Sequence, residues 1–279
     1  MDNTQAVRSP AVAGQFYPAN PQLLREEVIS YLDKVEIDRS ERDILALIAP
    51  HAGYTYSGPV AACAYCQVRG KSYETVVVIS PSHRVPFGFS SVFSGKGYET
   101  PLGEVPVDRE VVQALGALSN PDVRLGEHGH LDSMEHSLEV QLPFLQVVLD
   151  QFMLVPVVMG AQNASSSAAL GQALAGVLED RRALIVASSD LSHFHDRKLA
   201  QGLDERIVEC IDEFDPQRLL QEVSSRNCEA CGSGPMAAAM IAARQLGAEA
   251  GENLCYATSG DVSGDFSQVV GYTAGIFFK

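Results

Sequence analysis

The sequence predicts an α/β fold, a single domain in which helices flank a central, mostly parallel or mixed sheet. Helical patterns alternate with strands, which is typical of such sheets with right-handed crossovers. The 279 residues fit one domain, and no repeat or linker divides residues 1–279. Four short, continuously apolar runs predict strands buried on both faces, at residues 43–49, 75–80, 153–158 and 183–188.

The helices are predicted from prolines, caps and apolar stripes. Pro59 is tolerated in the first turn of a helix over 58–68, and Asp108 caps a helix over 108–118. An apolar stripe predicts a helix over 133–149, which Pro143 should kink. Further helices are expected at 163–178, 196–211, 216–224 and 235–246, and two last strands at 253–259 and 268–277.

Composition excludes several functional classes. The formal net charge of −15 argues against binding to the phosphate backbone of nucleic acid or to anionic membranes. The N-terminus lacks a signal-peptide pattern, and no apolar run reaches the ~18 residues of a membrane span. We therefore expect a cytoplasmic protein with reduced thiols, whose six cysteines serve packing, metal binding or reactivity.

Three predicted strands end in polar turns that carry histidine. His51 follows the strand at 43–49, His83 follows 75–80, and His193 follows 183–188. Ligands of open α/β sheets gather beyond the carboxyl ends of the strands, so these imidazoles indicate a metal or acid–base site. His51 and His83 are about one βαβ unit apart, and we expect them on neighbouring strand ends.

Asp190 and His193 are three residues apart after the third strand. If this segment turns helically, both side chains lie on one face, and the carboxylate orients the imidazole as a general base. The alternative is an Asp that caps a helix and a His that faces solvent.

Cys231 precedes a helix start marked by Pro235, an environment that favours a thiolate. A thiolate is a soft metal ligand or a nucleophile. Cys63 and Cys66 also suggest a zinc ribbon, but they fall inside a predicted helix, far along the chain from Cys228, so packing explains them better.

Two further residues are candidates for the lining of a pocket. His136 is one helical turn from Glu139 and is expected to lean toward the site, while Glu135 is explained by capping. Tyr54, close to His51, offers a phenolic hydroxyl to the pocket or packs in its wall.

Several motifs, in order along nearly the whole chain, resemble the Memo family, whose bacterial and archaeal members are called AmmeMemoRadiSam system protein B. The matching stretches are Pro10–Pro18, Ile48–Tyr56, Pro81–His83, Thr100–Gly103, Glu135–Pro143, Ser188–His193, Cys231–Pro235 and Gly271–Tyr272.

The resemblance implies a fold like that of class III extradiol dioxygenases, which use non-haem iron(II). It places His51, His83 and Cys231 at the metal-ligand positions, and His193 at the catalytic acid–base position with Asp190 beside it. Cysteine stands where the dioxygenases have a carboxylate, which admits copper as well as iron. The family name also implies a pathway link to an AMMECR1-like protein and a radical S-adenosylmethionine enzyme.

Three hypotheses follow. The first is a cytoplasmic oxidoreductase dependent on iron or copper, acting on a small molecule that the sequence does not identify. The second is a metal-free hydrolase or transferase with Cys231 as nucleophile, His193 as base and Asp190 as orienting group. The third is a binding or scaffold protein that keeps the pocket without turnover.

Overall fold

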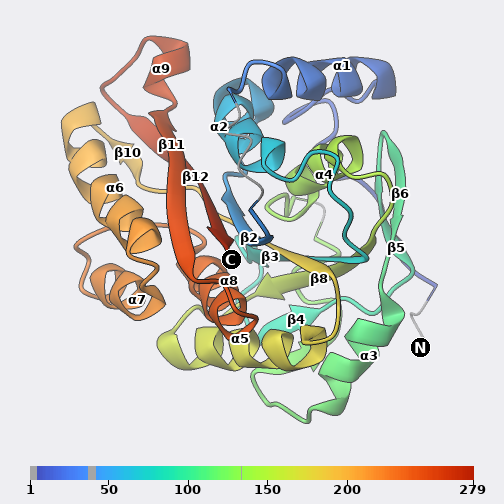
Figure 1. Ribbon diagram of the computed structural model, residues 1–279. Helices are drawn as coiled ribbons and strands as arrows, with labels where there is room; N and C mark the ends of the chain where they lie inside the picture. Colours follow the sequence, from blue (N-terminus) through green and yellow to red (C-terminus); the bar gives the residue numbers. More distant parts are fainter. Residues whose placement is uncertain (1–4, 37–41, 133) are drawn as a thin grey trace.

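A large mixed sheet forms the centre of the protein (Figure 1). The computed structural model describes residues 5–36, 42–132 and 134–279. Within them the main sheet has nine strands, eight of which follow the order β10-β12-β2-β9-β3-β8-β4-β7, while β11 pairs with β12. Their bounds are β2 Ile44–Ala49, β3 Thr75–Pro81, β4 Ser90–Val92, β7 Val123–Leu125, β8 Met153–Met159, β9 Ala183–Ser188, β10 His193–His195, β11 Ala250–Thr258 and β12 Val269–Phe278.

The parallel strands β2, β9, β3 and β8 stand together in the middle, and antiparallel strands flank them. They are apolar at almost every position because helices cover both faces. The predicted strands are therefore confirmed. The expectation that His51 and His83 follow neighbouring strands is wrong, because β9 pairs with both β2 and β3 and lies between them.

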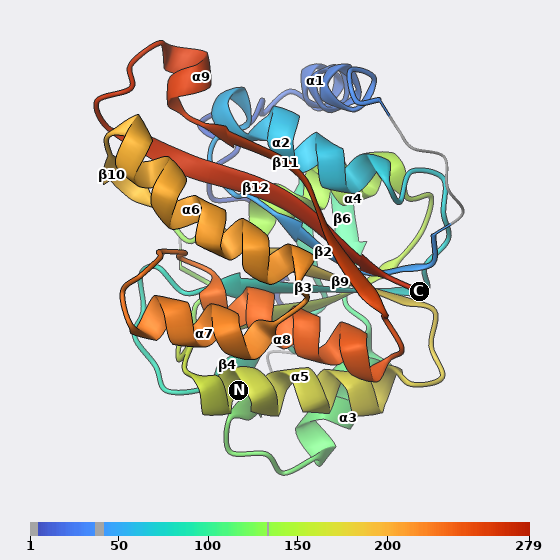
Figure 2. The same cartoon turned by 60° about the vertical axis from the view of Figure 1, so that its left-hand side comes forward.

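Two helical layers enclose the sheet. Helices α2, α4 and α1 pack together on one face, and α8 with α5 covers the other (Figures 1 and 2). Helix α6 packs on β11 and β12 and against α7. The bounds are α1 Pro21–Leu32, α2 Tyr54–Cys66, α3 Arg109–Ala117, α4 Leu142–Val148, α5 Ala164–Leu178, α6 Arg197–Asp212, α7 Pro216–Ser224, α8 Ser233–Gln245 and α9 Gly260–Ser263.

Most helix predictions are confirmed, but α2 begins at Tyr54, so Pro59 lies inside the helix and not in its first turn. Asp108 caps α3 by accepting from the backbone N–H of Val111, and α7 spans the predicted residues. The predicted helix over 133–149 is confirmed only in its second half. Residue 133 lies outside the described residues, and the segment forms only a 3-10 turn, Glu139–Gln141, followed by α4.

Local hydrogen bonds explain why the first turns of the helix predicted over 133–149 are absent. The Glu135 carboxylate accepts from the backbone N–H groups of His136 and Ser137 and from the Ser137 hydroxyl. Such side-chain contacts compete with the helical ladder. Glu135 is therefore turned toward β3 instead of capping a helix.

The N-terminal segment is tied to the same region by Glu139. The carboxylate of Glu139 accepts from Arg8 Nη1 at 2.5 Å, from the backbone of Ala11 and Val12, and from the Tyr17 hydroxyl at 2.5 Å. Strand β1, Val7–Arg8, also joins a small sheet with β5, Gly97–Thr100, and β6, Gly103–Pro106. The chain start thus packs against the residues that precede α4.

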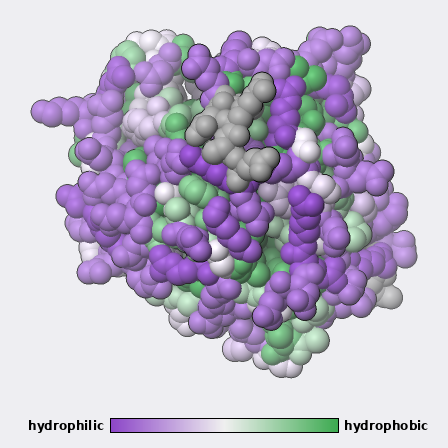
Figure 3. All heavy atoms as spheres, viewed as in Figure 1, coloured by the Kyte–Doolittle hydropathy of each residue, from purple (hydrophilic) through white to green (hydrophobic). Residues whose placement is uncertain are grey.

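Hydrophilic residues cover most of the face shown in Figure 3, with hydrophobic residues in smaller areas. None of the helices in the described residues is both long enough and apolar enough to cross a membrane.

We predict that His130 makes the fold sensitive to mild acid. Burial lowers the pKa of His130 to about 3, from an ordinary value of 6.5. Nε2 donates to the Ser91 carbonyl and Nδ1 accepts from the Tyr98 hydroxyl, so the folded protein holds a neutral ring. Between these two pKa values only the unfolded chain takes up the proton, and stability falls by about 1.4 kcal/mol per pH unit as pH decreases.

Urea titrations between pH 7 and 4.5 measure this effect. The variant His130→Gln should be less stable at pH 7 but should lose less stability toward pH 4.5 than the unmodified protein. Equal slopes for both proteins would contradict the assignment.

Candidate metal centre

Three histidines converge at the carboxyl edge of the central strands. His51, His83 and His136 each offer one ligand nitrogen, and these atoms all lie within 4.8 Å of one another. The ring centroids are 5.1 Å apart for His51 and His83 and 5.3 Å apart for His83 and His136. The turns after β2 and β3 therefore meet although β9 lies between the two strands.

His51 is held by the end of β9. Its Nδ1 lies 2.9 Å from the Ser188 hydroxyl, which itself donates to the Ser137 carbonyl and accepts from Gln141. The hydroxyl proton is therefore committed to Ser137, and the oxygen is left to accept from Nδ1–H of His51. This leaves a lone pair on Nε2.

His83 and His136 are oriented in the same way. Nδ1 of His83 lies 3.1 Å from the Glu135 carboxylate, which also accepts from the His83 backbone N–H at 2.6 Å. Nδ1 of His136 lies 3.3 Å from the Met134 carbonyl, and Phe16 packs on its ring. In all three histidines the Nδ1 proton is bound to oxygen, so Nε2 can accept a metal ion.

The electrostatics keep the rings of His51 and His136 neutral. Burial lowers the pKa of His51 and of His136, and the neighbouring histidines lower that of His51 further. Burial would raise the pKa of Glu135, but its hydrogen bonds to His83 and the His83 charge hold it well below its usual range. The site therefore has neutral imidazoles at His51 and His136 and a charged carboxylate at Glu135 beside His83.

Cys231 adds a sulfur atom to the cluster. Its Sγ lies 3.2 Å from Nε2 of His51, and the backbone N–H of Asp190 donates to it at 3.3 Å. Metal–nitrogen bonds of ~2.0–2.1 Å and metal–sulfur bonds of ~2.3 Å place neighbouring ligand atoms at about this separation. Cys231 and His51 are thus spaced as two ligands of one metal ion would be, while the group of ligand atoms within 4.8 Å of one another among the described residues consists of the three histidines.

The expected thiolate is not favoured in the free site. Cys231 does precede α8, but burial raises the pKa of its thiol well above the usual range, and the nearby Asp190 adds to the effect. Burial therefore raises the pKa of the thiol by more than the helix N-terminus lowers it. The thiol proton is therefore donated to Nε2 of His51, and a bound metal would replace it.

Asp190 contacts the His51 turn and not His193. Its Oδ1 accepts from the His51 backbone N–H at 2.7 Å, and among the described residues no hydrogen bond joins it to His193. Burial raises its pKa to about 7, against the opposing His51 backbone hydrogen bond. The expected helical turn is absent because His193 lies on β10, paired with Val270 of β12. The prediction that Asp190 orients His193 is therefore corrected.

His193 lies beside the cluster. Together with Cys231, Arg226 and Glu229 it lines a cavity of about 350 Å³. Burial lowers the pKa of His193, so the ring is neutral and can accept a proton. Tyr54 is not part of this lining. Its hydroxyl donates to the Val140 carbonyl at 2.6 Å and its ring packs on Phe144, so of its two expected roles Tyr54 takes the packing role.

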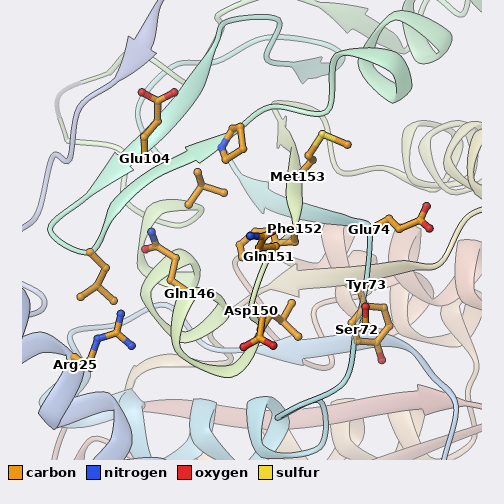
Figure 4. Close-up of a pocket in the computed structure, with 14 residues that line it drawn as sticks. Arg25, Ser72, Tyr73, Glu74, Glu104, Gln146, Asp150, Gln151, Phe152 and Met153 are labelled. Carbon is orange, nitrogen blue, oxygen red and sulfur yellow. The ribbon is translucent and has the colours of Figure 1, made fainter.

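Another cavity, of about 760 Å³, lies at the opposite edge of the sheet (Figure 4). Its lining includes Glu74 just before β3, Phe152 just before β8, and Arg25 of α1. It is remote from the histidines and is not part of the metal centre.

Sequence reasoning missed two supporting residues. Glu135 was explained as a helix cap, although its place directly before His136 and its carboxylate already offered a partner for a histidine. Ser188 gave no signal beyond its position at the end of a strand.

The fold and the site define an α/β protein with a histidine cluster able to hold a metal ion at the carboxyl edge of its sheet. The chain matches the family model described as Memo-like protein over residues 8–276, and it belongs to this family.

Similar proteins support the assignment of the chain to this family. A MEMO1 family protein of Methanopyrus kandleri is 40% identical, over 97% of this chain and 98% of its own. One of Methanothermobacter thermautotrophicus is 41% identical, over 95% and 98%. The crystal structure of an uncharacterized protein from Escherichia coli K12 superposes with a TM-score of 0.57 at 17% identity, covering 84% of this chain and 99% of that one, which supports the fold alone.

We predict that Glu135→Gln weakens metal binding by roughly 10–100-fold without unfolding the protein, because the amide no longer provides a charged acceptor for Nδ1 of His83. Competition with a chromogenic chelator measures the affinity. Glu229→Gln is the matched control, since Glu229 pairs at 3.0 Å with His195, outside the cluster. Equal losses in both variants would contradict a specific role of Glu135.

Proposed function

We propose that this protein is a metal-dependent redox protein that holds one iron or copper ion through His51, His83 and Cys231, with His136 as an additional imidazole donor. The observation that carries the proposal is the convergence of one ring nitrogen from each of three histidines within 4.8 Å of one another, with the Cys231 sulfur 3.2 Å from Nε2 of His51. This set includes the ligands expected from the sequence and adds His136 to them.

The donor types support this choice of metal. Imidazole and thiolate suit iron, copper and zinc, whereas magnesium and calcium prefer oxygen ligands. Iron(II) is our first choice, by the likeness to extradiol dioxygenases, and copper is the alternative. When bound, either ion supplies one-electron chemistry and open coordination positions.

The residues around the metal site would handle the substrate and its protons. The cavity of about 350 Å³ beside Cys231 has room for a small molecule. His193 faces the same cavity with a neutral ring, so it can take a proton from a bound substrate and return it later. Arg226 lines the cavity as well and gives it a positive group.

The second candidate is a metal-free hydrolase or transferase that uses Cys231 as nucleophile. The hydrogen bond from the Cys231 thiol to His51 favours it, but the base would then be His51 and not His193. The raised pKa of Cys231 opposes it, because the thiol and not the thiolate is present in the free site.

We predict that protein purified without air binds about one equivalent of iron or copper, measured by inductively coupled plasma mass spectrometry. His51→Ala combined with Cys231→Ser should remove the metal, because it deletes the central imidazole and the sulfur. The single variant His136→Ala should retain metal with lower affinity. Cys231→Ser should also remove the sulfur-to-metal charge-transfer absorption.

His195→Ala is the matched control, since His195 lies on β10 and pairs with Glu229 away from the cluster. Undiminished metal in the double variant would refute the site. Binding of zinc alone, with no uptake of iron or copper, would refute the redox function.

We also predict that iodoacetamide labels Cys231 in chelated, folded protein at least about tenfold more slowly than in urea-unfolded protein, because burial raises its pKa. Peptide mass spectrometry follows the labelling with time. Faster labelling in the folded state would favour the metal-free nucleophile over the proposed metal site.

A further inference from the structure

Two thiols that are far apart in the sequence meet between α2 and β11. Cys63 lies in the third turn of α2, and Cys255 lies on β11, which packs against that helix. The two side chains form a hydrogen bond with each other. Both also face one turn of the helix, since Cys63 Sγ lies 3.5 Å from the Pro59 carbonyl and Cys255 Sγ lies 3.8 Å from the Val60 carbonyl.

The other cysteines are placed differently. Cys66 is buried and donates to the Leu32 carbonyl, and Cys231 belongs to the histidine cluster. Cys210 and Cys228 interact electrostatically, but both are fully buried and burial raises the pKa of both. Cys63 and Cys255 are both partly exposed.

A cavity leads solvent to Cys63. It has a volume of about 490 Å³, and Cys63, Pro59 and Lys34 are part of its lining. A molecule as small as hydrogen peroxide fits this space easily. The hydrogen bond from Cys255 lowers the pKa of Cys63, which makes Cys63 the more nucleophilic of the two.

We propose that Cys63 and Cys255 are an oxidisable dithiol, which hydrogen peroxide converts into a disulfide that links α2 to β11. The Cys63 thiolate attacks one peroxide oxygen, which breaks the O–O bond and gives a sulfenic acid and hydroxide. The Cys255 sulfur then attacks the Cys63 sulfur, forming the S–S bond and releasing water. In total, two thiols lose two electrons and two protons, and one peroxide becomes two water molecules.

The link would join the helix that begins directly after the His51 turn to a strand near the end of the chain. It restricts the unfolded chain over most of its length, so oxidation should stabilise the fold. This site needs no metal, and it stands independently of the proposed redox function.

The experiment treats chelated full-length protein with one equivalent of hydrogen peroxide and digests it with trypsin without reduction. Trypsin cuts after Arg42, Arg69 and Arg244, so the expected product joins the peptides 43–69 and 245–279 and is two hydrogen atoms lighter than their sum. Dithiothreitol should separate them. The melting temperature should rise on oxidation and return on reduction.

Peptide 43–69 contains both Cys63 and Cys66, so three matched variants identify the cysteines that form the link. Cys66→Ser should still form the cross-link, whereas Cys63→Ser and Cys255→Ser should abolish both the cross-link and the shift in melting temperature. Circular dichroism before oxidation confirms that each variant is folded. The proposal is overturned if peroxide leaves the two peptides unlinked, or if the link survives Cys63→Ser.

Discussion

The buried carboxylate of Glu135 is the contact on which the histidine cluster depends. It accepts from both the backbone and the ring of His83, and it also fixes the backbone of His136 and Ser137. One carboxylate thus joins the end of β3 to the segment that carries the third histidine. A buried charge is tolerated only when several donors surround it, so the same contacts that stabilise the carboxylate define the site.

Neighbouring contacts extend this organisation. The Ser137 carbonyl accepts from the Ser188 hydroxyl at the end of β9. The Ser188 oxygen in turn holds the ring proton of His51 on Nδ1. Glu139 holds the N-terminal segment through Arg8 and Tyr17, and Phe16 of that segment packs on His136. The cluster is therefore a product of four separate parts of the chain, each fixed by a buried polar contact.

The strands and most helices could be predicted from the sequence because apolar runs and caps are local signals. His51 and His83 could be found because the strand-end rule applies to any parallel sheet, even though β9 separates their strands. The turn at Glu135 was missed because its competing hydrogen bonds reach His83, far away in the sequence. The protonation of Cys231 could not be predicted from the sequence either, because burial by distant segments raises the pKa of its thiol. The meeting of Cys63 with Cys255 likewise depends on how α2 packs against β11.

The position of β9 between β2 and β3 has a consequence for the order of folding. During synthesis, the two strands that precede His51 and His83 are made early. The strand that separates them, β9, is made more than a hundred residues later. A growing chain that ends before β9 must keep β2 and β3 from pairing directly, or separate them afterwards. The cluster is thus assembled late, from non-local contacts that are slow to form. A formed histidine cluster therefore indicates that nearly the whole chain has reached its final arrangement.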